Sequence, residues 1–321
     1  MTKSLKIIIG IALGLVIAGA VLAFVALAAV GFDVGKLGAG KFNTKEYTIE
    51  EPFSSVSVSV KTADVTFLPS EDGTVRVECY EGEKQPHTVG VVDGKLTIFG
   101  ADQRKWYEMI TIFSKSPKIR VYLPAGEYTS LSLETDTGDV TVPETVAFGT
   151  VKIETDTGDV ELYGGSPAQV EIETDTGDVT YAKSNPGAVK INADTGTVRI
   201  ADLAAGDISV DNDTGKVKMT DVSCAALSIE TDTGDVILKN VVGTGDAKIV
   251  TDTGDVEFDR CDAANYEIKT DTGDVEGTLR SGKLYTASSH TGKINLPEHD
   301  TAGGAFKVST HTGDVRITIE E

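Results

Sequence analysis

The chain has 321 residues, of which 50 are Asp or Glu and 29 are Lys or Arg, so its formal net charge is −21. This charge argues against nucleic acid as a partner, because the phosphates would be repelled, and it favours cations, cationic peptides or simple solubility. A glycine count of 34 with only 6% aromatic residues favours a narrow core of stacked layers over a wide globular core.

The N-terminal stretch 7–32 contains 26 residues without a charge and follows Lys3 and Lys6. At about 1.5 Å per residue, a helix of this length exceeds a hydrocarbon core of about 30 Å. We therefore predict a single transmembrane helix in the lipid bilayer, with residues 1–6 as a short cytoplasmic head and the C-terminal body outside the cell. A cleaved signal peptide is the alternative, because Ala26-Leu27-Ala28 resembles a cleavage site.

Residues 33–127 lead from this segment into a repeated region. The glycines in 33–44 predict a flexible linker. Residues 45–127 are rich in strand-forming patterns, and we predict that they form a first coil, with a degenerate turn at 61–65, and a β-hairpin cap over one end of a solenoid. Hairpin signals lie at 71–73 and 93–94. The richest apolar cluster is predicted to pack this cap or to bind a partner; it comprises Trp106, Tyr107, Met109, Ile110, Ile112 and Phe113.

The stretch 128–321 contains ten copies of one motif, most often TDTGDV. Their glycines recur every 19 to 21 residues, which is typical of a solenoid with one coil per repeat. These glycines are Gly138, Gly158, Gly177, Gly196, Gly215, Gly234, Gly254, Gly273, Gly292 and Gly313. The Asp-Thr-Gly triplet also occurs in aspartic proteases, but those enzymes need two opposed carboxylates in one cleft, and in two copies here the Asp is His290 or His311.

Apolar residues alternate with polar ones on both sides of each motif. Counting from the glycine, they occupy positions −7 and −5 before it and +2 and +4 after it, as in Val170, Ile172, Val179 and Tyr181. This period of two predicts two short strands per coil, each with one face turned inward. The predicted fold is all-β: a parallel β-helix of about ten coils of 19–20 residues, in which each coil stacks on the next one in the chain.

The motif itself is predicted to form the corner between the two strands. Glycine provides the backbone freedom of a sharp corner, and Asp at −2 can form an Asx turn. Thr at −1 is present in all ten copies, and stacked threonines are expected to form hydrogen bonds along the column.

Asp at −2 and at +1 would stack into two acidic columns along one edge. Solvation and Asx hydrogen bonds can offset the repulsion, and the alternative is Ca²⁺ bound between coils, since Ca²⁺ takes six to eight oxygen ligands. The +1 column is interrupted by Thr197, Lys216 and Lys293. The candidate metal ligands are Asp136, Asp139, Asp156, Asp159, Asp175, Asp178, Asp232, Asp235, Asp252, Asp255, Asp271 and Asp274.

Other reactive residues give weaker signals. Cys224 and Cys261 are two coils apart, about 10 Å, so we predict buried apolar fillers rather than a disulfide. His290 and His311 share one corner position and are expected to lie close together. The sequence contains no Ser-His-Asp, Walker or dinucleotide pattern, and we predict a non-enzymatic protein without catalytic or cofactor-binding residues, apart from the Ca²⁺ alternative.

The stretch VYLPAGEYTSLSLETDTGDV at 121–140, followed by repeated strand-TDTGDV-strand units, resembles the bacterial "putative adhesin" β-strand-repeat family of unknown function. The resemblance covers residues 50–321 and implies a membrane-anchored envelope protein with an adhesin-like, binding or envelope-stress role, whose partner is an envelope polymer or protein. A sensor or sink for divalent cations or cationic peptides is the alternative function. A hydrolase acting on envelope glycans is a third hypothesis, and it would need an acid pair in a cleft.

Overall fold

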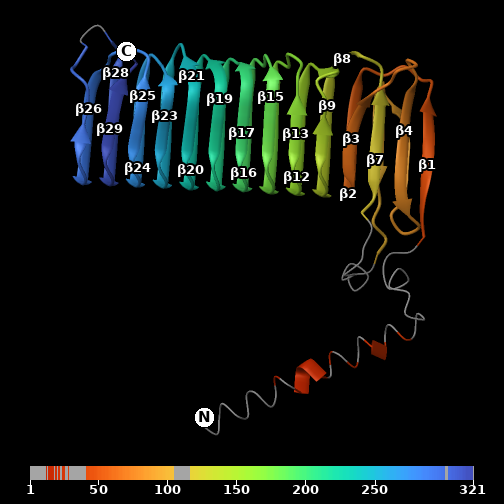
Figure 1. Ribbon diagram of the computed structural model, residues 1–321. Coiled ribbons are helices and arrows are strands. Elements are labelled where there is room, and N and C mark those ends of the chain that lie inside the picture. The colour runs from red at the N-terminus through yellow and green to blue at the C-terminus, as the bar shows by residue number, and fades with distance from the viewer. Residues whose placement is uncertain are drawn as a thin grey trace.

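The computed structural model describes residues 41–104, 116–300 and 303–320, together with scattered helical positions between 12 and 28. The β-strands stand side by side in one long row, with the N-terminal strands at one end and the C-terminal coils at the other (Figure 1). Most of the predicted membrane segment 7–32, most of the linker 33–44 and the aromatic cluster between 106 and 113 lie outside the described residues. In the described part of the chain, no helix is long and apolar enough to span a membrane.

The strands form two large sheets that face each other across one core. Sheet A runs in spatial order through β1 (Phe42–Ile49), β4 (Val75–Gly82), β7 (Lys118–Leu123), β3 (Asp64–Pro69), β10 (Val140–Val142), β13 (Val160–Tyr163), β15 (Val179–Ser184), β17 (Val198–Ala204), β19 (Val217–Cys224), β21 (Val236–Gly243), β23 (Val256–Cys261), β25 (Val275–Leu279), β29 (Val315–Ile319) and β27 (Ile294–Asn295).

Sheet B runs through β26 (Leu284–Thr291), β28 (Ala305–Thr312), β24 (Asn265–Thr272), β22 (Asp246–Thr253), β20 (Ala226–Thr233), β18 (Asp207–Thr214), β16 (Ala188–Thr195), β14 (Gln169–Thr176), β12 (Thr150–Thr157), β9 (Ser130–Thr137), β2 (Ser55–Thr62), β6 (Lys95–Gly100) and β5 (His87–Val92). A small third sheet pairs β8 (Gly126–Tyr128) with β11 (Val146–Phe148).

Each repeat contributes one strand to each large sheet, with the motif at the corner between them. Equivalent residues pair in parallel from coil to coil, as Val151 pairs with Val170 and Val160 with Val179. The side chains at −7, −5, +2 and +4 are buried in every repeat except at Gly277 and in the coil 284–296. The predicted all-β solenoid is therefore confirmed, with the predicted positions forming its core.

The corner glycines make the closest contact between coils. A Cβ atom added to Gly177 would lie 2.0 Å from the carbonyl oxygen of Gly158, the equivalent glycine of the preceding coil. The backbone amide of Gly177 in turn donates to the carbonyl oxygen of Thr195 at 2.9 Å. Glycine is therefore needed at the corner because the neighbouring backbone occupies the space of any side chain.

The chain before the repeats follows a different topology. The degenerate turn at 61–65 is confirmed as a coil, because β2 pairs in register with β9 and β3 with β10. The hairpin predicted at 93–94 joins β5 and β6, which pair antiparallel. The hairpin predicted at 71–73 is wrong, because β7 inserts between β3 and β4 and pairs with both of them.

The last two coils do not stack in chain order. Strand β28 pairs with β24 on one side and with β26 on the other, and β29 likewise lies between β25 and β27. The C-terminal coil 305–319 is therefore inserted inside the stack, and the preceding coil 284–295 is displaced to its end. The predicted sequential order is wrong here, because every coil has the same register and several orders satisfy the same pairing.

We expect Gly177→Ala to lower the free energy of unfolding by about 3 kcal/mol or more, because the methyl group would force two coils apart. The measurement is chemical denaturation followed by circular dichroism. Gly90→Ala is the matched control, since a Cβ atom added there would have no other atom within 4 Å and the φ angle of Gly90 is ordinary. Equal losses for the two variants would contradict the corner-packing account.

Candidate functional site

The +1 aspartates form a ladder of hydrogen bonds between coils. The backbone amide of Asp178 donates to Oδ1 of Asp159 at 2.7 Å, and the amide of Asp159 donates to Oδ1 of Asp139 at 2.9 Å. The same contact recurs near the other end, where the amide of Asp314 donates to Oδ1 of Asp274 at 2.7 Å. Each of these carboxylates therefore accepts the exposed amide of the next coil, a structural role that the sequence pattern did not predict.

Basic side chains neutralise part of this column. Arg199 contacts Asp178 at 2.7 Å and Lys216 contacts Asp235 at 2.7 Å. The hydrogen bond from Arg199 and the amide of Thr197 hold the pKa of Asp178 below its usual value, and Lys216 likewise lowers the pKa of Asp235. The +1 column is thus a mixed ladder of charges and amides, not a bare acidic edge.

The −2 column is exposed on the outer side of sheet B. At one end Lys61, which occupies the −2 position of the first coil, contacts Asp136 at 2.9 Å. At the other end His311 and His290 stack with ring centroids 4.9 Å apart and planes within 7°. The expected contact between the two histidines is confirmed, whereas the expected Asx turns at −2 are absent from the hydrogen bonds of the described residues.

Acidic residues at −4 widen this column into an acidic face. Residues 129–321 contain 36 Asp and Glu but only 15 Lys and Arg. On sheet B, Glu230 at −4 lies beside Asp232 at −2, next to Asp211 and Asp213 of the adjoining coil. Burial and the charges of Glu230, Asp213 and Asp232 raise the pKa of Asp211. Like charges are therefore crowded on this face, which we call the acidic face: the −4 and −2 residues of β9, β12, β14, β16, β18 and β20.

The predicted metal ligands lie in the two columns but are not gathered into one cluster. Within residues 41–104, 116–300 and 303–320, no three His, Cys, Asp or Glu side chains are grouped so that they could hold a metal ion. The +1 carboxylates point along the stack toward neighbouring amides, and the −2 carboxylates lie in the exposed column. The calcium alternative remains a prediction that binding experiments must test.

A column of buried threonines lies at position −3, which the sequence analysis did not assign to the core. Thr135, Thr155, Thr174 and Thr231 are buried, and their hydroxyl oxygens have no hydrogen-bond partner within the usual limits. Further along, the hydroxyl of Thr251 donates to the carbonyl of Gly234 at 3.4 Å. The −1 threonines predicted to form a ladder are instead exposed, with no hydrogen bond between them in the described strands. The alternation of inward and outward side chains along the sheet B strand continues from −7 and −5 to −3. This period of two was the signal in the sequence that could have identified the buried threonines.

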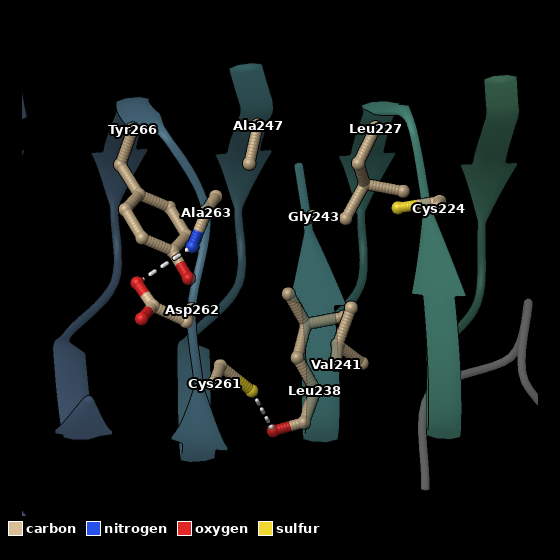
Figure 2. A pocket seen from close by; sticks show the side chains of 10 residues that line it. All are labelled: Cys224, Leu227, Leu238, Val241, Gly243, Ala247, Cys261, Asp262, Ala263 and Tyr266. Atoms are coloured by element: carbon tan, nitrogen blue, oxygen red, sulfur yellow. Dashed lines mark hydrogen bonds between the residues drawn. The ribbon is translucent and has the colours of Figure 1, made fainter. Parts of the chain in front are cut away.

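Cys224 and Cys261 lie in the core, as predicted, and all three cysteines are free and buried. Figure 2 shows Cys224 and Cys261 on different strands around a cavity of about 10 Å³, with Leu227, Ala247 and Tyr266 also lining it. The Cys261 thiol donates to the carbonyl of Leu238 at 3.2 Å. Burial raises the pKa of the Cys224 thiol to about 11. The cavity has room for no more than about one water molecule.

A shallow groove of about 480 Å³ follows the starts of strands β14 to β22 on sheet B. Its floor is apolar and includes Val189, Ile208 and Leu227, and Lys190 and Lys248 stand at its side. The small side chains at the neighbouring outward positions, such as Ala188 and Ala226, leave this groove open. It crosses five coils and is broad and open rather than an enclosed substrate cleft.

A buried ionic group lies in the N-terminal part of the body. Glu81 accepts hydrogen bonds from the backbone amide of His87 at 2.6 Å and contacts Nδ1 of His87 at 3.0 Å. Lys45 forms an ion pair with the same carboxylate. Burial lowers the pKa of His87 against the opposing effect of Glu81. Burial tends to raise the pKa of Glu81, but its bonds to Lys45 and His87 bring it below its usual value.

With this architecture established, the chain can be compared with known proteins. It matches the Toastrack DUF4097 family over residues 53–211 and 188–321. The chain belongs to this family. Its resemblance to the bacterial "putative adhesin" β-repeat family of unknown function is thereby confirmed. A search of curated proteins finds no match.

Several solved structures are similar to this Toastrack chain in fold. A "putative adhesin" from Bacteroides fragilis NCTC 9343 has 13% identity and a TM-score of 0.35, with 87% of this chain and 97% of the other covered. A "putative lipid binding protein" from Parabacteroides distasonis ATCC 8503 has 14% identity and a TM-score of 0.36, with 87% and 99% covered. A "putative adhesin" from the same organism has 9% identity and a TM-score of 0.36, with 88% and 100% covered.

The aspartate ladder predicts different effects for two substitutions at one position. Asp159→Ala removes the acceptor of the Asp178 amide and should cost about 1 kcal/mol in the free energy of unfolding. Asp159→Asn keeps an oxygen acceptor and removes a charge, so it should change stability by less than about 0.5 kcal/mol. Thermal and urea unfolding of both variants provide the measurement. Equal destabilisation by Asn and Ala would show that the carboxylate charge, not the hydrogen bond, matters.

The Glu81–His87 contact predicts a loss of stability in acid. The folded pKa of His87 lies below its ordinary value of 6.5. The stability that neutral His87 contributes is therefore fully present above pH 6.5 and is lost as the pH falls from 6.5 through the folded pKa. The lowered pKa of Glu81 adds stability that is present above 4.5 and is lost as the pH falls through its folded value.

Melting temperatures between pH 7.5 and 4 measure this effect, and His87→Gln should flatten the upper part of the curve. Thr88→Ser, at the exposed neighbouring position, changes no titratable group, so it is the control and should leave the slope unchanged. A curve for His87→Gln identical to that of the wild type would contradict this assignment.

Proposed function

We propose that this Toastrack chain is a membrane-anchored, extracytoplasmic β-solenoid that acts by binding, as a non-enzymatic adhesin-like or envelope-stress scaffold protein. The observation that carries the proposal is the acidic face, a continuous charged surface on a rigid stack. Such a surface attracts and orients cationic or polar partners over a long distance. The partner would be an envelope polymer or another envelope protein.

The anchor and the localisation rest on the sequence. Residues 7–32 have the length and apolar character of a membrane-spanning helix, and the glycines that follow suit a flexible tether. The short head with Lys3 and Lys6 favours a cytoplasmic N-terminus. We also assign the antiparallel strands β1, β4 and β5 to a cap, because they flank the N-terminal end of both parallel sheets.

A sensor or sink for divalent cations or cationic peptides is the second candidate. It is favoured by the crowding around Asp211, where burial and, after it, the neighbouring carboxylates raise the pKa of this side chain. A bound cation would relieve this repulsion. The carboxylates of the −2 column, apart from Asp136, which contacts Lys61, would be its contacts.

Pull-down with the full-length chain in mild detergent tests the binding proposal. We expect envelope material to be retained by the wild type and released when Asp156, Asp175 and Asp194 are changed together to Asn. The control changes Asp202, Asp221 and Asp259 to Asn, which removes the same charge from sheet A. Retention of nothing specific by the wild type, or equal loss in both triple variants, would contradict a role of the acidic face.

Thermal unfolding in millimolar Ca²⁺, with Mg²⁺ at matched ionic strength, separates the two candidates. If the aspartate columns bind calcium, the melting temperature rises with Ca²⁺ and not with Mg²⁺, and the rise disappears in the Asp156, Asp175, Asp194 triple variant. Equal curves in the two salts would eliminate the calcium sensor and leave binding of a polymer, a protein or a cationic peptide.

A further inference from the structure

The coil at the C-terminal end of the stack differs chemically from the others. Residues 277–297, which include this coil, contain no Asp or Glu but contain Arg280, Lys283 and Lys293, and Glu298 and Asp300 follow in the adjoining loop. The rest of the repeat region is strongly acidic. This coil also lies at the end only because the chain inserts its last coil, with Asp314 and Arg316, further inside the stack.

The outer edge of this coil carries free main-chain groups. The backbone amide of Leu284 donates inward to the carbonyl oxygen of Gly304 at 2.8 Å. Because main-chain groups alternate in direction along a strand, those of Thr286 and Ser288 also face β28, and those of Ala287 and Ser289 face outward. The outward amide of Tyr285 is taken by Nδ1 of His299 at 3.2 Å. No described strand pairs with this side of β26.

Natural proteins usually protect such an edge with charges, proline or a bulge. Strand β26 has the sequence LYTASSHT, with no Lys, Arg, Asp, Glu or Pro. At the opposite end of the stack, the edge strand β1 of sheet A carries Lys45 and Glu46, whereas β5, the opposite edge of sheet B, has the sequence HTVGVV and no Lys, Arg, Asp or Glu. The displaced coil 284–295 also exposes Leu284 at 48% and Ile294 at 45% of their surfaces. The edge is therefore chemically suited to pairing.

We propose that this end is a docking surface for a second copy of the same chain, joined head to head about a twofold axis. A twofold axis perpendicular to the stack pairs β26 with its own copy in antiparallel orientation and does the same for β27. Both sheets can thus continue across one isologous interface. Ala287 and Ser289 supply the main-chain hydrogen bonds, and Ser288 lies near the axis.

Charge favours a second copy at this end rather than at any other surface. Side-by-side association would bring the acidic faces of two molecules together. End-to-end pairing instead joins β26 and β27, which carry no acidic residue, at an end where residues 277–300 hold three basic and two acidic side chains, and it keeps the acidic faces far apart. Because the overall charge still repels, pairing should strengthen as salt is added, unlike attraction between opposite charges.

This inference deepens the proposed function and rests on it. If the N-terminus is anchored as proposed, the β26 end is the part of the stack farthest from the N-terminal strands that follow the anchor (Figure 1). Head-to-head pairing would then connect molecules on two facing membranes. The partner of the adhesin-like protein would be a copy of itself on the opposing surface.

Sedimentation equilibrium of the full-length chain in mild detergent tests the pairing. The mass should approach twice that of the monomer as concentration increases. Ser288→Asp and Ser288→Lys should each weaken the dimer roughly fivefold or more, because each places like charges opposite each other at the axis. An equimolar mixture of the two variants should restore pairing, since Asp then faces Lys.

Asn192→Asp is the matched control, because Asn192 occupies the same −4 position in the middle of the stack. It should leave the mass unchanged. A monomer at all concentrations, a dimer insensitive to both Ser288 substitutions, or a mixture that fails to pair would each overturn the proposal.

Vesicle clustering separates this inference from the broader proposal. Liposomes carrying the reconstituted chain should aggregate, and those carrying Ser288→Asp should not. If wild-type liposomes remain dispersed while the pull-down still retains envelope material, homotypic pairing is wrong and the binding proposal stands. If they cluster without any such retention, pairing stands and the acidic face loses its proposed role.

Discussion

The close approach of successive corner glycines determines the rest of this structure. Because the carbonyl oxygen of one glycine occupies the place of a side chain on the next, every coil must turn at the same position and at the same height. That constraint holds both sheets in register, at about 4.8 Å per coil. Equivalent positions of successive repeats therefore stack into a straight column. A residue type that recurs once per repeat then forms a continuous line of side chains, either on the surface or in the core.

The charge pattern follows from the same repetition. A column of aspartates at coil spacing would be repulsive, yet at +1 each carboxylate accepts the amide of its neighbour and several contact Lys or Arg. At −2 and −4 the carboxylates accept no backbone amide of the next coil, and although Lys61 contacts Asp136 and Lys152 contacts Glu154, acidic side chains remain crowded around Asp211. One column therefore serves the stability of the stack, while the other is available for contacts with a partner. The distinction depends on which way the side chain points at the corner, not on residue type.

Much of this architecture could be predicted from the sequence. The alternation around Val170 and Val179 indicated the two strands per coil, and the glycine spacing indicated the stacking. The buried Thr135 column was missed because a hydroxyl residue within a polar motif was assigned to the surface. The insertion of β7 between β3 and β4, and of β28 between β24 and β26, could not be predicted, because parallel pairing is equally compatible with several partners. The hydrogen-bonding role of Asp159 depends on a neighbouring coil and has no local signature.

The most direct test of this account is disulfide formation between −2 positions of the last coils. The original thiols are buried, and burial raises their pKa values, so background exchange should be low. Inserted stacking places Asp271 beside His311, with His290 one coil further out. We predict that Asp271→Cys with His311→Cys forms a disulfide under mild oxidation and that Asp271→Cys with His290→Cys does not. Cross-linking of only the second pair would show that the coils stack in chain order and would contradict the account.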